Sequence, residues 1–350
     1  MAKSKTSTKK RPISIGLQGG GAHGAFTWGV LDRLLEDGRL DIKAVTATSA
    51  GAMNAVAFAS GLAEGGVDGA RETLERFWQE ISRQGAPLAA ITPPPMPMGL
   101  DAFNPFSNFT PFSFVTALQS FASPYDLNPF DFNPLRDAID RVVDFEAVRA
   151  APVELHIAAT NVETGRVKVF SGDEVTLDAT LASACLPQTF KAVEIDGEPY
   201  WDGGYLGNPS IFPLIYSDAP KDVLLVLLNP LERAGPPKSA GAIQDRLNEI
   251  SFNAALLGEL RAIAFVQKLL DENWLTDRVR GQYRRLHMHA INGGAALCEL
   301  SLETKYDTRW GFLTDLRDRG RDYASTWLTD CATKIGKQST VDLKGEFLSV

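Results

Sequence analysis

Cysteine is scarce in this sequence of 350 residues, and its placement excludes two kinds of stabilising framework. The chain has only Cys185, Cys298 and Cys331, and no two of them stand at CxxC spacing. A disulfide-stapled fold needs more cysteines in pairs, and a zinc site needs ligands at close spacing. We therefore expect reduced thiols in a cytoplasmic protein, and we expect no metal site.

An excess of positive charge is also missing. Lys and Arg number 35 against 43 Asp and Glu, so the net charge is −8. Proteins that coat nucleic acid need a basic surface, so we expect no nucleic-acid partner. Residues 1–11 carry five basic residues and are predicted to be a flexible, solvated tail, with weak attraction to anionic lipid head groups as the alternative.

Long hydrophobic runs are absent as well, so we expect neither an export signal nor a membrane span. No continuous apolar stretch long enough for an export signal follows the basic residues 1–11. The uncharged run at residues 44–63 has the length of a spanning helix, but it is rich in Ala, Gly, Ser and Thr and contains Asn54. We interpret it as a buried strand, turn and helix of a soluble domain.

The sequence does contain an alternation of strand and helix patterns. Short apolar runs predict strands at residues 12–18, 42–46, 153–160, 223–228 and 286–291, with hairpins at 153–170 and 192–201. Apolar residues spaced three or four apart predict helices near residues 26–38, 55–58, 70–81, 243–260 and 313–328. This alternation is typical of an α/β fold in which helices cover both faces of a parallel sheet.

A change in composition marks an insertion at residues 87–134. This stretch holds ten of the 20 prolines and eight of the 19 phenylalanines, but only three charged residues. Prolines at this density oppose long helices and central strands, and long loops within compact domains are usually functional. Two interpretations remain open: an aromatic insertion packed on the core, or an apolar lid beside a site for an apolar substrate.

A glycine-rich loop, Gly19 to Gly24, joins the first predicted strand to the first predicted helix. Unpaired N–H groups and the helix dipole attract negative charge there, and glycines let an anion approach the backbone. The loop can therefore hold a pyrophosphate or the oxyanion of a tetrahedral intermediate. A dinucleotide site also needs an acidic residue after the second strand. This chain has Val45 to Ser49 there, none of which is acidic, and this disfavours a nucleotide as the ligand.

Two further positions carry candidate catalytic groups. Ser49 stands between small residues on a predicted strand-to-helix turn, which is the arrangement of a nucleophile elbow, and the alternative is a helix-capping serine. Asp202 precedes two glycines in a predicted tight turn, and it is either the base for a serine or a plain loop aspartate. Asp202 follows Ser49 by 153 residues, so spacing alone does not bring the two together.

Together these motifs resemble the patatin-like phospholipase family. The resemblance rests on GGGAHG at residues 19–24, on the serine turn one strand and helix later, and on ASACLPQTF and WDGGYLGNP at residues 182–190 and 201–209. It covers about residues 12–228, and it implies a doubly wound, mostly parallel sheet in an α/β/α sandwich. The implied activity is hydrolysis of lipid acyl esters by a Ser–Asp dyad that needs no histidine, metal or cofactor.

Carried onto this chain, the resemblance implies Ser49 as the nucleophile and Asp202 as its general base. Backbone N–H groups of three residues are then the expected oxyanion donors: Gly20, Gly21 and Ala22. Five glycines are expected to support the motifs: Gly19, Gly24, Gly51, Gly203 and Gly204. The domain is expected over residues 12–335, followed by a C-terminal tail at 336–350. The expected partner is a lipid or acyl-ester substrate, met in the cytoplasm or peripherally at a membrane or lipid surface.

Two residues depart from the family pattern. Ala47 stands where the serine turn usually begins with glycine, and its methyl group fits if the following helix lies slightly further from the strand. His23 stands where the glycine-rich loop commonly carries arginine. A permanent positive charge is thereby replaced by a group that is expected to titrate near neutrality.

Several competing interpretations remain at this stage. His287 and His289 follow Asp202, which would allow a Ser–Asp–His triad, although histidines on a strand are more often structural. The same serine could also transfer its acyl group to an alcohol or a thiol. The glycine-rich loop could bind a nucleotide, and the whole fold could be a lipid-binding module without catalysis.

Overall fold

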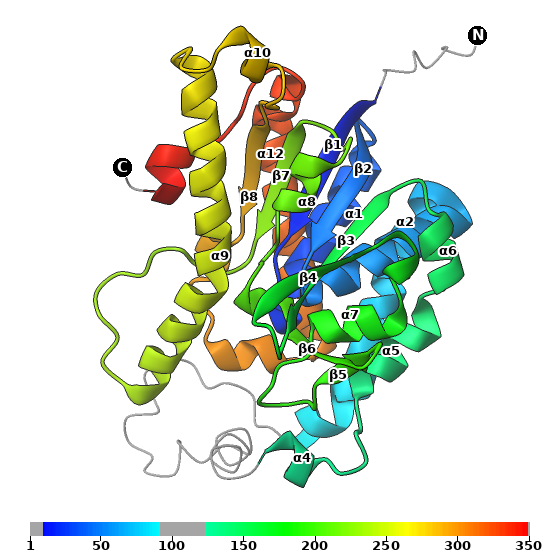
Figure 1. Ribbon diagram of the computed structural model, residues 1–350. Helices are drawn as coiled ribbons and strands as arrows, with labels where there is room; N and C mark the ends of the chain where they lie inside the picture. Colours follow the sequence, from blue (N-terminus) through cyan, green and yellow to red (C-terminus); the bar gives the residue numbers. More distant parts are fainter. Residues whose placement is uncertain (1–9, 92–122, 349–350) are drawn as a thin grey trace, which may run out of the picture.

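An eight-stranded sheet forms the centre of the computed structural model, which describes residues 10–91 and 123–348 (Figure 1). The strands lie in the order β5-β6-β3-β2-β1-β7-β8, and β4 pairs with β3 outside this path. Five neighbouring strands, β3, β2, β1, β7 and β8, are parallel, whereas the other pairings are antiparallel. The strand bounds are β1 (Arg11–Leu17), β2 (Leu40–Ala47), β3 (Glu154–Asn161), β4 (Arg166–Ser171), β5 (Val193–Ile195), β6 (Glu198–Asp202), β7 (Asp222–Leu227) and β8 (His287–Asn292).

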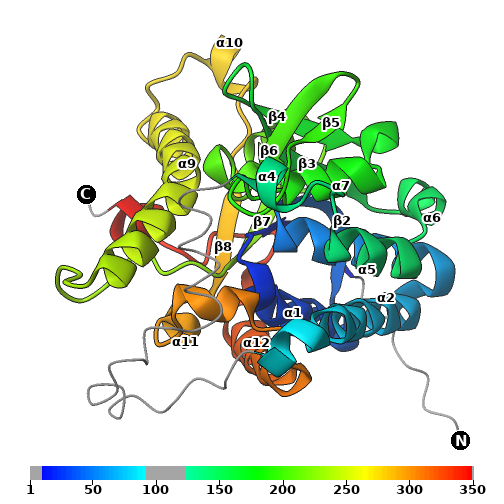
Figure 2. The same cartoon turned by 90° about the horizontal axis from the view of Figure 1, so that it is seen from below.

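Helices cover both faces of the sheet, which confirms the predicted α/β/α sandwich with a doubly wound, mostly parallel sheet (Figure 2). One face carries α1 (Gly24–Asp37), α2 (Ala50–Ile91) and α12 (Trp310–Asp330), and the other carries α8 (Phe212–Tyr216) and α9 (Ala240–Asp271). Shorter helices complete the fold: α4 (Pro124–Leu127), α5 (Pro134–Val142), α6 (Phe145–Ala150), α7 (Leu177–Ser183), α10 (Asp277–Arg280) and α11 (Gly294–Leu297).

The apolar run of β7 shows how the two layers of helices are held to the sheet. Successive side chains of a strand point to opposite faces, so a strand covered on both sides is apolar throughout. Leu224 and Val226 belong to the core cluster beneath α1 and α12. Val223, Leu225 and Leu227 belong to the second cluster, beneath α8 and α9. This central strand is therefore buried along its length, as its uninterrupted sequence predicts.

Glycines determine where two of the helices end or bend. Gly38 follows α1 in the left-handed region, with a φ of 71°, and its N–H donates to the carbonyl oxygen of Leu34 at 3.2 Å. This geometry is a common helix C-cap. The helices predicted near residues 55–58 and 70–81 are joined in α2, which is interrupted by non-helical backbone at Gly65 and Gly66.

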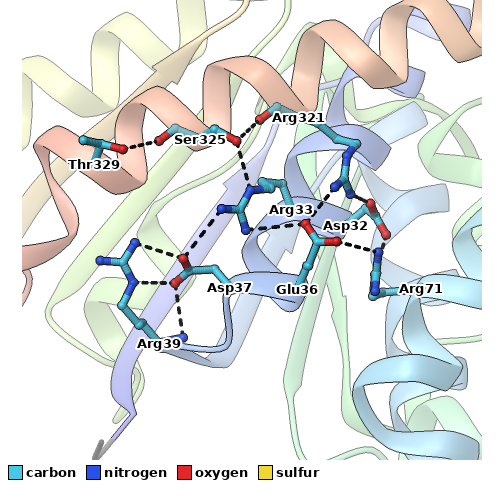
Figure 3. Close-up of polar contacts among 9 residues, drawn as sticks. All are labelled: Asp32, Arg33, Glu36, Asp37, Arg39, Arg71, Arg321, Ser325 and Thr329. Carbon is cyan, nitrogen blue, oxygen red and sulfur yellow. Dashed lines mark hydrogen bonds and ion pairs between the residues drawn. The ribbon is translucent and has the colours of Figure 1, made fainter.

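A network of charged side chains ties α1 to the helices beside it (Figure 3). Asp32 of α1 forms ion pairs with Arg71 of α2, at 2.6 Å, and with Arg321 of α12. Arg321 also pairs with Glu36 at 2.7 Å. Because α1 directly follows the glycine-rich loop, this network anchors the helix whose first turn adjoins the candidate site.

The structure describes only some of the segments that the sequence predicts to be tails or an insertion. Residues 1–9 of the predicted basic tail and residues 92–122 of the predicted insertion lie outside the described residues. Residues 336–348, predicted to be a tail, pack on the domain: Leu343 and Phe347 are buried in the cluster beneath α9. In the ranges that are described, no helix combines the length and the apolar character needed to cross a membrane.

Candidate active site

The serine turn lies at the carboxyl end of β2, where Thr48 and Ser49 connect the strand to α2. Ser49 has a backbone φ of 55°, which lies in the left-handed region that residues other than glycine rarely adopt. Its N–H donates to the hydroxyl oxygen of Ser183 at 2.9 Å, and the residue is 9% exposed. Such a conformation persists where the surrounding packing imposes it, and it is common at functional sites.

The glycine-rich loop after β1 packs directly against this turn. A Cβ built on Gly19 would lie 2.6 Å from Cβ of Ser49. A Cβ built on Gly51 would collide with the carbonyl oxygen of Leu17, the last residue of β1. Neighbouring atoms also exclude a side chain at the other glycines predicted to support the motifs: Gly24, Gly203 and Gly204. Gly19, Gly24 and Gly51 therefore leave the space in which the glycine-rich loop and the serine turn contact each other.

The loop presents N–H groups that are available to an anion. Among the described residues, no acceptor is found for the N–H groups of Gly20, Gly21 and Ala22. The carbonyl oxygen of Gly20 accepts from the N–H of His23 at 3.2 Å, and that of Gly21 accepts from the N–H of Gly24. Because C=O and N–H of a trans peptide point in opposite directions, these bonds fix the directions of the Gly21 and Ala22 N–H groups.

Asp202 ends β6 and is completely buried. Its N–H donates to the carbonyl oxygen of Cys185 at 2.8 Å, and its Oδ1 accepts from the N–H of Gly204 at 2.7 Å. Burial raises the pKa of Asp202 to about 7, although the hydrogen bond from Gly204 and the contact with Ser49 act in the opposite direction. The carboxyl group therefore changes its charge close to neutral pH.

The Ser49 hydroxyl and the Asp202 carboxyl lie within interaction range, and their contact lowers the pKa of Asp202. The contact falls short of full hydrogen-bond geometry, because Oδ2 of Asp202 has no such partner among the described residues. Catalytic hydrogen bonds are often loose before substrate binds and tighten in the complex. A carboxyl group with one open oxygen beside a hydroxyl can accept the proton of that hydroxyl.

The segment after Asp202 joins the two loops to each other. Oδ1 of Asn208 accepts from the N–H of Gly19 at 2.7 Å, and Oγ1 of Thr48 donates to the carbonyl oxygen of Gly207 at 2.6 Å. Nε2 of Gln18 donates to the carbonyl oxygen of Asn208 at 3.3 Å. The structure thus brings the glycine-rich loop, the serine turn and the WDGGYLGNP segment together in one place.

Comparison with known proteins identifies the group to which this arrangement belongs. The sequence pattern of the family described as patatin-like phospholipase matches residues 16–215, more than half of the chain. The chain belongs to the patatin-like phospholipase family. The matched span contains the glycine-rich loop, Ser49 and Asp202. This membership confirms the resemblance seen in the sequence and places the chain in a family of lipid hydrolases.

Two solved structures are similar to this patatin-like chain at low sequence identity. VipD from Legionella pneumophila is 15% identical, with 99% of this chain and 75% of that chain aligned and a TM-score of 0.42. The structure of full-length SpcU in complex with full-length ExoU from the type III secretion system of Pseudomonas aeruginosa matches at 16% identity, over 91% of this chain and 53% of that chain, with a TM-score of 0.31. No curated protein sequence gives a significant match. The family assignment therefore rests on the sequence pattern at residues 16–215.

His23 differs from the sequence expectation, because it does not titrate near neutrality. Burial, and to a smaller extent the charge of Lys305, lowers the pKa of His23 to about 3. Its Nε2 is hydrogen-bonded to Oγ1 of Thr304 at 2.7 Å. The imidazole is therefore neutral at physiological pH and does not replace the charge of the arginine common in the patatin-like family. Ala47, the other departure, is fully buried where β2 ends beside Leu17.

His287 and His289 do not form a triad with Ser49. Both contact Oδ1 of Asp222, at 3.3 and 3.1 Å, and His289 also contacts Oγ1 of Thr340 at 2.9 Å. Asp222 and His287 are paired at the amino ends of the parallel strands β7 and β8. The serine turn follows the carboxyl end of β2, so these histidines lie at the opposite edge of the parallel strands.

The structure adds residues that sequence reasoning did not single out. Ser183 and Asn208 lie within the motifs quoted for the family, but their contacts with Ser49 and Gly19 join segments far apart in the chain. Asn229 and Lys305 belong to no motif and lie beyond the span that the family pattern matches. A single sequence holds no local signal for such contacts, since they depend on how distant segments pack.

Cys185 contacts the site through its backbone carbonyl oxygen, which accepts from Asp202, and not through its thiol. The three thiols form no disulfide in the described part of the chain. Burial raises the pKa of Cys185 to about 12, and its Sγ donates to the carbonyl oxygen of Lys191 at 2.9 Å. Among residues 10–91 and 123–348, no group of three or more His, Cys, Asp or Glu side chains is arranged to hold a metal ion.

Proposed function

We propose that this protein hydrolyses carboxylic esters of lipids with Ser49 as nucleophile, Asp202 as general base, and the N–H groups of Gly20, Gly21 and Ala22 as oxyanion donors. One observation carries the proposal: the Ser49 hydroxyl contacts a buried Asp202 carboxyl beside a loop that packs on the serine turn. Acyl transfer requires a nucleophile, a base and anion donors within one site.

In the proposed reaction, Oγ of Ser49 attacks the ester carbonyl carbon while its proton moves to the Asp202 carboxylate. The carbonyl oxygen becomes an oxyanion that accepts hydrogen bonds from the loop N–H groups. When the tetrahedral intermediate collapses, the bond to the alcohol oxygen breaks and Asp202 returns the proton to that oxygen. Water then attacks the acyl-enzyme by the same route, which releases the fatty acid and restores Ser49.

The pKa of Asp202 supports its role as a base in this proposal. A general base is most effective when its pKa lies near the working pH, because it is then both ionised and able to bind a proton. Burial raises the pKa of Asp202 to about 7. An ordinary, exposed aspartate would be ionised at neutral pH but would accept a proton from a serine hydroxyl far less readily.

Exposed apolar side chains support peripheral contact with a membrane or another lipid surface. Phe130 and Phe132, which follow α4, are 95% and 66% exposed, and Leu247 and Ile250 in the first half of α9 are 54% and 50% exposed. Both segments lie at the end of the molecule toward which the parallel strands run (Figures 1 and 2). Contact of this end with lipid would bring acyl esters to the carboxyl edge of the sheet.

A panel of phospholipid, acylglycerol and short p-nitrophenyl esters tests the proposed activity. We expect the wild-type chain to cleave esters, and we expect Ser49→Ala and Asp202→Asn to lower kcat by about 10³-fold or more, because removal of a nucleophile or its base abolishes most catalysis. Both variants are compared with the wild type by circular dichroism to verify folding. Full activity in either variant would remove that residue from the proposed chemistry.

Two further measurements separate the proposal from its alternatives. A fluorophosphonate probe is expected to label the wild-type chain at Ser49 and not the Ser49→Ala variant. A wild-type chain that binds lipid but resists the probe would instead be a lipid-binding module without catalysis. Product analysis with added glycerol distinguishes hydrolysis, which releases free fatty acid, from a transacylase reaction, which forms a new ester with the same serine.

A further inference from the structure

A partly buried lysine from the last third of the chain lies against the glycine-rich loop. Lys305 belongs to the 3₁₀ turn Leu302–Tyr306, which precedes α12. A Cβ built on Gly21 would lie 2.5 Å from the carbonyl oxygen of Lys305 and 3.2 Å from its Cβ. The backbone of Lys305 therefore packs on a residue that we propose as an oxyanion donor, although Lys305 lies outside the family span of residues 16–215.

The ammonium group of Lys305 reaches the loop through one intermediate side chain. Nζ of Lys305 donates to Oδ1 of Asn229 at 2.7 Å, and Nδ2 of Asn229 donates to the carbonyl oxygen of Gly19 at 3.0 Å. Asn229 is buried just after β7, and its N–H donates to Oε1 of Gln18 at 2.9 Å. Both ends of the Asn229 side-chain amide are thus engaged, which fixes its orientation between the lysine and the loop.

The carbonyl oxygen of Gly19, which is the last acceptor in this chain of hydrogen bonds, belongs to the same peptide unit as the N–H of Gly20. The carbonyl group of Gly19 and the N–H of Gly20 are parts of one planar unit and point in opposite directions. A hydrogen bond to that carbonyl oxygen therefore holds the N–H in a fixed direction on the other side. Linked hydrogen bonds also polarise one another, so a cation at the far end makes the Gly20 N–H a stronger donor.

We propose that Lys305 and Asn229 are positioning residues of the oxyanion hole, which orient and polarise the Gly20 N–H toward the developing oxyanion. This inference rests on the proposed ester hydrolysis. Lys305 thereby supplies the positive charge that the neutral His23 does not provide next to the loop. Neither residue needs to touch the substrate, because both act through the Gly19–Gly20 peptide.

The surroundings of Lys305 determine the pH range in which this charge is present. Lys305 interacts with Glu249 and Asp245 of α9 and with Asp202 of β6, which favour its charged form, while Arg233 opposes it. Burial dominates and lowers the pKa of Lys305 to about 8. The polarising charge is therefore present at neutral pH and is lost as the pH rises above about 8.

Steady-state kinetics and the rate of phosphonylation of Ser49 by a fluorophosphonate probe test the inference. We expect Lys305→Met and Asn229→Ala each to lower kcat on a p-nitrophenyl ester by about 10- to 100-fold with KM little changed, since loss of a whole oxyanion donor lowers kcat by about 10²–10³-fold. The kcat of the double variant is expected to be no lower than that of the less active single variant, because both residues act on one peptide. Lys168→Met, in an exposed ion pair on β4, is the matched control and is expected to retain full activity.

The pH dependence separates a polarising role from a structural one. In the wild type, the phosphonylation rate is expected to fall above about pH 8, and this decline is expected to be absent in Lys305→Met. Wild-type kcat in a folded Lys305→Met or Asn229→Ala variant, or an unchanged decline above pH 8, would overturn the inference. A wild-type chain that is not labelled at Ser49 would refute the proposed function itself, so the two failures are distinguishable.

Discussion

Gly19 and Ser49 approach each other so closely that a Cβ on Gly19 would lie 2.6 Å from Cβ of Ser49. The same added atom would lie 3.0 Å from the carbonyl oxygen of Thr48 and 3.2 Å from Oδ1 of Asn208. The glycine-rich loop and the serine turn are therefore in contact before any substrate binds. Their relative position determines how the proposed nucleophile faces the proposed oxyanion donors.

Replacement of Gly19 by alanine is expected to separate these two loops. We expect Gly19→Ala to lower kcat/KM by about 10²-fold, because a displacement of about 1 Å at a catalytic group has an effect of that size. We also expect a loss of about 1–3 kcal/mol in the free energy of unfolding, from overpacking. The matched control is Gly258→Ala in α9, where an added Cβ meets no atom within 4 Å. Wild-type kinetics in Gly19→Ala would contradict the proposed dependence on loop contact.

The activity is expected to depend on the ionisation of Asp202. The proposed base is active only as the carboxylate, and its pKa is raised to about 7. We therefore expect kcat/KM on an uncharged p-nitrophenyl ester to rise about tenfold per pH unit below about pH 6 and to level off between about pH 7 and pH 8. The measurement is a pH–rate profile at constant ionic strength. A rate that stays constant down to pH 5 would show that another group accepts the proton.

The same residue is expected to lower the stability of the wild type as the pH rises from about 4 to about 7. A carboxyl group with a raised pKa in the folded state stabilises the fold below its unfolded pKa of about 4, and this contribution is lost as the pH rises through about 7. Asparagine cannot ionise, so Asp202→Asn avoids this loss. We expect its free energy of unfolding, measured in urea, to exceed the wild-type value by an amount that grows between pH 5 and pH 7. A difference that shrinks over this range would contradict the burial argument.

A partly buried carboxyl group in α9 holds that helix to the start of α8. Oε2 of Glu259 accepts from the N–H groups of Ile211 and Phe212, both at 2.7 Å, and burial raises the pKa of Glu259 to about 7. We expect Glu259→Ala to reduce the free energy of unfolding by about 1–3 kcal/mol, because two N–H groups lose their acceptor. Glu259→Gln keeps an acceptor oxygen and is expected to lose less. Equal losses in the two variants, measured by urea unfolding, would show that these hydrogen bonds contribute little.

Local patterns in the sequence predicted much of the architecture because they encode local conformations. The hairpin expected around Asp196 and Gly197 is formed with both residues at positive φ, 54° and 80°, as a tight hairpin turn requires. Gly38 ends α1 because it too adopts a positive φ. The uninterrupted apolar run of β7 reflects the burial of that strand on both faces of the sheet. In these cases the physical cause lies within a few residues of the element itself.

Sequence by itself also determined the family and the candidate groups, since the family pattern at residues 16–215 contains Ser49 and Asp202. Only the tertiary structure decided that these two side chains meet, that Asn208 and Asn229 hold the glycine-rich loop, and that Lys305 packs against it. The neutral state of His23 likewise follows from burial. Contacts and pKa shifts of this kind arise when distant segments exclude water from one another, and no local pattern in a single sequence records that event.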